Sequence, residues 1–174
     1  MKKSYVATGL AVVSACVALS GVAQASPARA VLSGDGYHGL KLGMSEAGAK
    51  NSGVLLGTPW DDGTCDRYQT VDRPDDQRAV ALSHQLGVVE ERAPRSARTP
   101  EGIGAGSTVA QIKRKYADAQ SYRNGFTARV PGYADRFYTF WVEGSDGSGN
   151  YPDSAKVTDI ALSSVSFDCP LLGD

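Results

Sequence analysis

The chain has 174 residues, of which 41% are hydrophobic and 21% are charged, and its formal net charge at pH 7 is −1. A nearly balanced charge excludes the strong electrostatic attraction with which basic domains bind nucleic acids or anionic membranes. The length suits one domain or two very small ones.

Residues 1–25 are predicted to be a secretory signal peptide. Lys2 and Lys3 precede an apolar run, and small residues around Ala25 favour cleavage before Ser26. Because this leader holds two lysines and no acid, its removal changes the formal charge from −1 to −3. No other run is apolar and long enough to predict a transmembrane helix. We therefore expect a secreted, extracellular protein.

A second interpretation of the leader stays open. The letters VSAC, ending at Cys16, resemble the lipobox after which a lipoprotein is cleaved and acylated at the cysteine. In that case the protein is a lipoprotein on the outer face of the cell membrane. Both interpretations place the folded part of the chain outside the cytoplasm.

After a flexible lead-in over residues 26–36, a first half over residues 37–98 is expected to contain a short helix and strands. Ser45 is a suitable N-cap for a helix that begins at Glu46 and stops near Gly53. The polar stretch 57–77 is predicted to be a loop. Alternating apolar residues from Val80 onward, interrupted at Gly87, predict two strands joined by a tight turn.

A second half over residues 99–174 repeats this order. Thr108 and Gln111 have the spacing of a capping box, and the following residues form an apolar helical stripe. Aromatic residues between positions 133 and 141 predict the strongest strand of the chain, and residues 156–165 predict another. Short helices packed on a mostly antiparallel sheet give an α+β fold.

Two cysteines follow the leader, Cys65 and Cys169. An even number in an oxidising compartment predicts one disulfide, which would join the two halves.

Two glycine-containing segments suggest an internal duplication. Letters GLKLGMSEA begin at Gly39 and letters GIGAGSTVA begin at Gly102, with the same glycine and cap positions at a constant offset of 63. Together with the helix and strands that follow each segment, this pattern resembles the small envelope domains grouped as SmpA/OmlA-like. These include outer-membrane assembly lipoproteins and, in tandem form, the secreted β-lactamase inhibitory proteins. The second half also resembles a common type of uncharacterised actinobacterial secreted protein.

The resemblance implies a helix-plus-sheet module, used twice, whose sheet serves as a protein-binding face. It covers roughly residues 39–169. This chain departs from the tandem pattern in one respect, because that pattern implies a disulfide within each repeat and this chain has one cysteine pair for both halves.

The glycines at 102, 104 and 106 precede a helix, as in many phosphate sites. However, Ser107 replaces the third glycine of the dinucleotide fingerprint, and no lysine precedes it as a P-loop requires. We interpret the glycines as a structural turn and predict no cofactor.

No metal site and no catalytic group are predicted. His38 and His84 are far apart in the sequence, and His84 is in register with the strand that begins at Val80. The acidic segments 60–66 and 146–153 lack the spacing of a calcium loop and are interpreted as polar loops. No G-x-S-x-G motif is present.

The aromatic strand is the strongest candidate for a binding surface. Both of its faces are apolar, so either both faces are core or one face is exposed for recognition. The hypothetical binding residues are Tyr133, Arg136, Phe137 and Trp141. The leading hypothesis is a non-catalytic, inhibitor-like module that binds an unidentified protein partner outside the cell. A lipid-anchored envelope assembly factor and a small secreted hydrolase are the alternatives.

Overall fold

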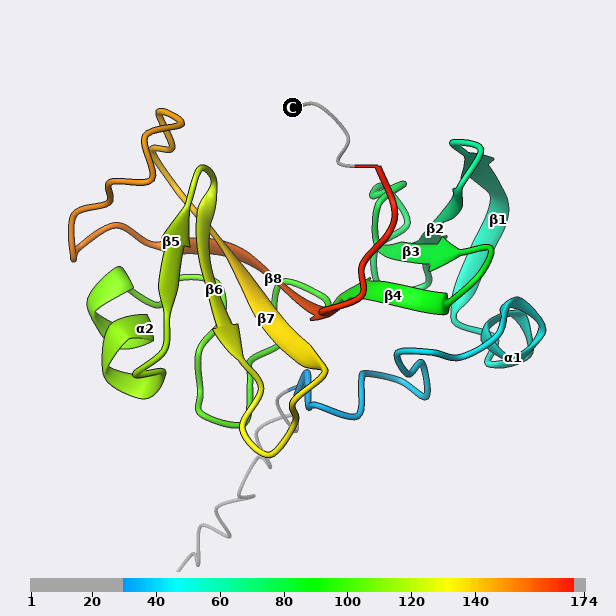
Figure 1. Ribbon diagram of the computed structural model, residues 1–174, viewed down its shortest axis with the longest axis horizontal. Coiled ribbons are helices and arrows are strands. Elements are labelled where there is room, and N and C mark those ends of the chain that lie inside the picture. Colours follow the sequence, from blue (N-terminus) through cyan, green and yellow to red (C-terminus); the bar gives the residue numbers. More distant parts are fainter. Residues whose placement is uncertain (1–29, 171–174) are drawn as a thin grey trace, which may run out of the picture.

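The computed structural model describes residues 30–170, so the predicted signal peptide and Cys16 lie outside the described residues (Figure 1). Two short helices and eight strands form in this range: α1 (Glu46–Asn51), β1 (Leu55–Asp61), β2 (Cys65–Thr70), β3 (Val80–Ser83), β4 (Gly87–Arg92), α2 (Val109–Lys115), β5 (Gln120–Tyr122), β6 (Gly125–Arg129), β7 (Arg136–Val142) and β8 (Val157–Ser164).

All eight strands belong to one antiparallel sheet with the order β1-β2-β3-β4-β8-β7-β6-β5. Each helix is followed by a four-stranded meander, and the last strand of one meander pairs with the last strand of the other. At this seam Glu90 lies opposite Ser163, and Arg92 lies opposite Ala161. Figure 1 shows β4 and β8 meeting at the centre, with α2 and α1 at opposite ends of the molecule.

Both helices begin where their capping residues predict. The Ser45 hydroxyl accepts a hydrogen bond from the amide of Gly48 at the start of α1. At the start of α2, Thr108 and Gln111 each bond the other's backbone amide, which is the predicted capping box. These contacts satisfy amide groups that have no partner within a helix.

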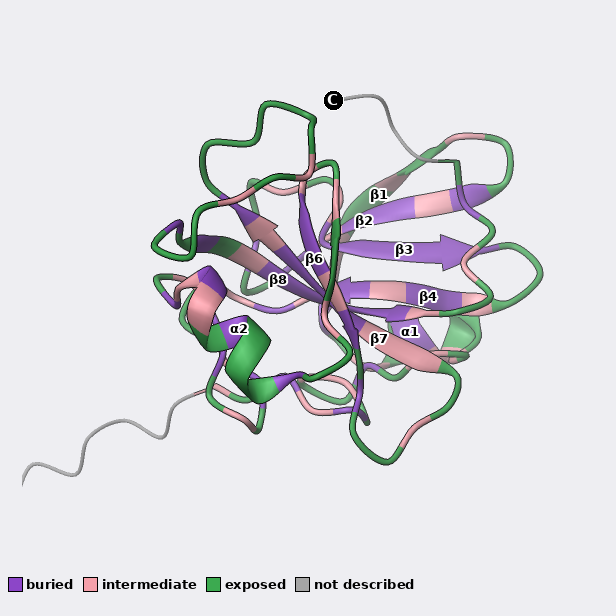
Figure 2. Cartoon of the chain, turned by 60° about the vertical axis from the view of Figure 1, so that its left-hand side comes forward, coloured by how far each residue is buried: buried purple, intermediate pink, exposed green. Residues whose placement is uncertain are grey.

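The larger core cluster lies under α2. Val109 and Ile112 of this helix and its C-cap Tyr116 pack on residues from the second meander, including Tyr138 and Phe140. Figure 2 shows the buried side of α2 turned toward the strands and its opposite side exposed.

A smaller core cluster lies under the first meander. It is built mainly from strand residues, including Tyr68, Val80 and Val88, and α1 contributes only Ala49 to its buried members. The sheet therefore dominates the fold and the helices cover it loosely. The predicted antiparallel sheet with short helices is confirmed at this coarse level.

Residues 31–37 cross the helix side of the seam. The hydroxyl of Tyr138 donates to the carbonyl of Leu32 at 3.1 Å, and the amide of Tyr37 donates to the carboxyl of Glu91 at 3.1 Å. Leu32 is fully buried in the larger core cluster. These contacts tie the start of the described chain to both meanders.

The predicted disulfide between Cys65 and Cys169 is confirmed, with a Cα–Cα distance of 5.6 Å. It holds residues 165–170, here called the tail, on the face of the first meander that points away from the helices. Asp168 accepts a hydrogen bond from Ser83 at 2.8 Å, and Arg67 donates to the carbonyl of Pro170 at 2.8 Å. Phe167 packs on the small cluster around the disulfide.

Two expectations about local structure are wrong. Residues 57–77 were predicted to be a loop, but β1 and β2 occupy most of this stretch. Strand β1 was missed because it is a largely exposed edge strand and lacks an alternating apolar pattern. Strand β2 was missed because it contains charged residues such as Arg67, whose buried charge is balanced by Asp62 and by the carbonyl of Pro170 in the tail. His84 was expected to be a strand residue, but it lies in the exposed turn between β3 and β4.

Within residues 30–170, neither helix combines the length and the apolar character that crossing a membrane requires.

Candidate protein-binding face

The alternation of side chains along β7 separates its aromatic residues onto two faces. Tyr138 and Phe140 are fully buried in the core under α2. Phe137 and Trp141 point to the opposite side of the sheet, here called the far face, and both are partly exposed. The sequence left open whether this second face is core or surface, and the structure places its two largest side chains at the surface.

One row of paired residues crosses the far face from β1 to β6. The strand registers align, in order, Trp60, Arg67, Ala81, Glu90, Ser163, Phe137 and Arg129. The tail contacts the first-meander end of this row at Arg67. The row therefore has an aromatic residue and an arginine at each of its two ends: Trp60 with Arg67 on β1 and β2, and Phe137 with Arg129 on β7 and β6. The tail lies on the first of these pairs.

A charged network surrounds Trp141. The guanidinium carbon of Arg92 lies 4.3 Å from the centre of the indole ring, which is a cation–π contact. The same guanidinium lies 3.4 Å from a carboxylate oxygen of Glu90 and 3.8 Å from one of Asp76. These contacts restrict the orientation of the partly exposed ring of Trp141.

The loop after β2 adds a second arginine to this network. Arg73 donates to Asp159 at 2.7 Å and to the carbonyl of Ala93 at 2.8 Å, and it also pairs with Asp76 at 2.9 Å. Burial opposes the charge of Arg73, but the bonds and charges of Asp159 and Asp76 outweigh it, so the pKa of the guanidinium is raised. Arg73 is therefore a permanent cation that anchors this loop to β8.

A polar depression of about 580 Å³ opens beside this network. The loop after β2, the seam strands and the segment after β4 line it with Asp72, Arg73, Pro74, Asp75, Asp76, Arg92, Arg95 and Asp159. Since Arg92 also contacts Trp141, the depression adjoins the Trp141 ring. Aromatic side chains beside arginine are typical of protein-recognition surfaces.

Only half of the predicted binding set lies on this face. Arg136 precedes Tyr138 by two residues and so points to the helix side, where it donates to the carbonyl of Gly34. Tyr133 lies outside β7; its ring stacks with Arg136 at 4.4 Å and its hydroxyl donates to Asp35. The proposed binding role of Tyr133 and Arg136 therefore does not involve the far face, and this pair instead holds residues 34–35.

Sequence reasoning also missed several members of the surface. Glu90 and Arg92 lie two residues apart on β4, so strand alternation could have placed them on one face. No local pattern signals Arg73, because its partner Asp159 is 86 residues away.

The glycine-containing segment 102–106 is held by hydrogen bonds from the side chain of Arg98. Arg98 donates to the carbonyls of Gly102 and Ala105 and to the hydroxyl of Ser107. This arrangement agrees with the interpretation of the glycines as a structural turn.

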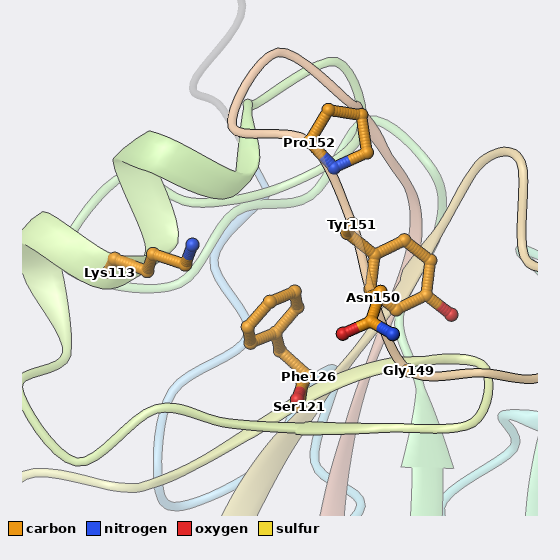
Figure 3. Close-up of a pocket in the computed structure, with 7 residues that line it drawn as sticks. All are labelled: Lys113, Ser121, Phe126, Gly149, Asn150, Tyr151 and Pro152. Atoms are coloured by element: carbon orange, nitrogen blue, oxygen red, sulfur yellow. The ribbon is translucent and has the colours of Figure 1, made fainter.

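Figure 3 shows a second hollow, of about 320 Å³, on the helix side. Lys113 of α2 and Tyr151 of the loop after β7 lie on either side of the Phe126 ring. The ammonium of Lys113 already pairs with Asp153 at 2.7 Å. Because this charge is already paired, we consider the far face a stronger candidate for a functional site than this hollow.

No protein-family model matches the chain, and no curated protein is significantly similar to it. Among solved structures, the fold is similar to the crystal structure of the uncharacterized protein yfeY from Escherichia coli. The TM-score is 0.50 and the sequence identity is 15%, over 76% of this chain and 99% of that chain. Such a likeness concerns the fold alone, since one fold can carry many functions.

Proposed function

We propose that this protein is a secreted, non-catalytic binding module that engages a protein partner outside the cytoplasm through its far face. The observation that carries the proposal is the partly exposed pair Phe137 and Trp141, on one side of β7 and flanked by the Arg92 network. Large aromatic residues beside arginine dominate the binding energy of many protein interfaces. A ring already fixed by a cation–π contact also loses little conformational entropy on binding.

The tail gives this proposal a second support. It lies on the first-meander part of the same face, where the Phe167 ring centre is 5.9 Å from the guanidinium of Arg67. The far face is therefore able to hold a peptide segment by aromatic and arginine contacts.

The proposed location is supported by the disulfide. Bonds of this kind persist in oxidising compartments and are rare in the cytosol. The mass of the mature N-terminus tests the location. Free secretion gives a chain beginning at Ser26, whereas an acylated Cys16 would show that the protein is membrane-anchored.

We propose further that the two halves are related by duplication. The helices begin at Glu46 and Val109, which are 63 residues apart like the two glycine segments. Gly39 and Gly102 have φ angles of 87° and 89°, and Gly43 and Gly106 have φ angles of 78° and 83°. Equivalent left-handed turns before equivalent helices support a common origin, as does the mirrored strand order around the seam.

The binding proposal is tested by capture from culture supernatant and cell-wall fractions. Bound proteins are identified by mass spectrometry, purified and titrated against the wild type and against Phe137→Ala/Trp141→Ala. We expect the double variant to lose at least tenfold in affinity, because each aromatic anchor contributes more than about 1 kcal/mol in a typical interface.

Leu86→Ala is the control variant, since Leu86 is 41% exposed but lies in the turn between β3 and β4. It is expected to keep full affinity. Circular dichroism and thermal unfolding verify that both variants remain folded. If the double variant binds every purified partner as tightly as the wild type, the far face is not the binding surface.

A further inference from the structure

Three potential metal ligands meet at the tips of the two hairpins of the first meander. The Nε2 atom of His84 lies 3.8 Å from Oδ1 of Asp61 and 3.7 Å from Oδ1 of Asp66. One ligand atom from each residue lies within 4.8 Å of the other two. The imidazole is thus placed between two carboxylates at distances longer than a normal hydrogen bond to either.

These separations leave room for an ion at the centre of the three atoms. A point equidistant from atoms so arranged lies about 2.4 Å or less from each, close to the roughly 2.0–2.2 Å of zinc–nitrogen and zinc–oxygen bonds. A small movement of the exposed Asp61 and His84 side chains, which are 61% and 43% exposed, would shorten all three distances to bonding values.

The strand register explains why these groups converge. Asp61 and Asp66 are direct cross-strand partners on β1 and β2, an arrangement in which like charges destabilise a sheet. The amide of His84 donates to the carbonyl of Thr64 at 3.1 Å, which fastens the second hairpin to the first. Cys65, next to Asp66, is fixed by the disulfide. The backbone therefore holds two facing carboxylates with an imidazole beside them.

No lysine or arginine among residues 30–170 forms an ion pair with Asp61 or Asp66. The side chain of Asp66 is only 14% exposed, so solvent compensates its charge poorly. On the neighbouring helix, Glu46 lies near enough to interact with His84, and Lys50 is paired with Glu46. The local excess is therefore negative.

We propose that Asp61, Asp66 and His84 bind a divalent transition-metal ion, with water completing the coordination. One imidazole with two carboxylates suits zinc and similar ions better than calcium or magnesium, which prefer oxygen ligands alone. The ion would neutralise the facing aspartates and join edge strand β1 to the β3–β4 turn. The sequence analysis predicted no metal site because it treated segment 60–66 and His84 separately.

The chain contains a matched control for this site. His38 also faces a carboxylate, at 2.8 Å from Asp72, but among residues 30–170 no second acid joins this pair in the same arrangement. One imidazole with one carboxylate offers only two ligand atoms, so His38 is not expected to retain a metal.

Isothermal titration of the tag-free, disulfide-bonded chain with ZnCl₂ tests the proposal. We expect saturable binding of one ion per chain, at least tenfold weaker in His84→Gln and Asp66→Asn and unchanged in His38→Gln. Zinc should also raise the thermal unfolding temperature of the wild type but not of His84→Gln, because an ion that binds only the folded state stabilises it.

Parallel titrations with CaCl₂ and MgCl₂ test whether the imidazole of His84 contributes to metal binding. Calcium binding that is as tight as zinc binding and survives His84→Gln would overturn the imidazole's role. Absence of saturable zinc binding up to about 1 mM, which is a very weak affinity, would overturn the site itself. Circular dichroism of each variant excludes misfolding as the cause of lost binding.

Discussion

At the scale of single residues, Glu91 is a carboxyl group placed where its charge is costly. It is 2% exposed on the helix side of β4 and lies opposite Leu162 on β8. Burial raises its pKa to about 8, although the hydrogen bond from the Tyr37 amide opposes this effect. The folded protein therefore holds this proton at pH values where the unfolded chain releases it.

This difference predicts the direction in which stability changes with pH. Because the folded state binds more protons than the unfolded state between about pH 4.5 and pH 8, the contribution of Glu91 to stability falls as pH rises through that window. We expect the denaturant midpoint of the wild type to decrease from pH 5 to pH 8.5. Glu91→Gln should remove much of this decrease, since the amide does not titrate. An equally steep decrease in Glu91→Gln would show that other groups cause it.

At the scale of secondary structure, the two faces of β7 are expected to have separable roles. Phe140→Ala should lower the free energy of unfolding by about 3–5 kcal/mol, because it leaves a cavity under α2. Phe137→Ala should cost clearly less, since its ring is already partly exposed. Chemical denaturation of both variants measures the difference. Equal losses would mean that the far face is as important to folding as the core.

The capping box of α2 gives a second prediction at this scale. Thr108→Ala removes the hydroxyl that accepts from the Gln111 amide and should cost about 1 kcal/mol. Thr108→Ser keeps a hydroxyl at the same position and is expected to change stability by much less. Thermal unfolding monitored by circular dichroism compares the two variants. If both lose the same stability, the cap is not responsible.

Local signals predicted those elements whose cause is local. Ser45 and Thr108 identified the helix starts, and the aromatic alternation of β7 placed Phe137 and Trp141 on one face. Strands β1 and β2 were missed because their stability depends on contacts with distant residues. Buried Arg67 on β2, for example, is satisfied by a carbonyl 103 residues away.

The candidate site was predictable only in part for the same reason. Tyr133 and Arg136 have the composition of a binding surface, but they bind the chain's own residues 34–35. Arg73 and Asp159 meet only after the loop following β2 has folded onto β8. No window of sequence contains both partners, so no local pattern reveals the pair.

At the scale of the whole molecule, the disulfide fastens the tail to the first meander across 104 positions. In the chain-entropy model, closing a loop of about 100 residues stabilises a protein by about 4–5 kcal/mol. Cys65→Ala/Cys169→Ala should therefore lower the denaturant midpoint strongly, and a reductant should lower that of the wild type alone. Limited proteolysis should cut near Phe167 once the tail is free. An unchanged midpoint in the double variant would show that the tail is held by other contacts.

The seam between β4 and β8 has a consequence for the order in which the protein is made. Strand β4 ends at residue 92, yet its partner does not begin until residue 157. A chain emerging from a ribosome or a translocation channel can pair β4 with β3 early, but the other edge of β4 has no partner until β8 has appeared. Long-range pairing of this kind folds slowly and leaves the edge open to other chains meanwhile. The complete sheet, and with it the far face, is assembled only after β8 has been synthesised.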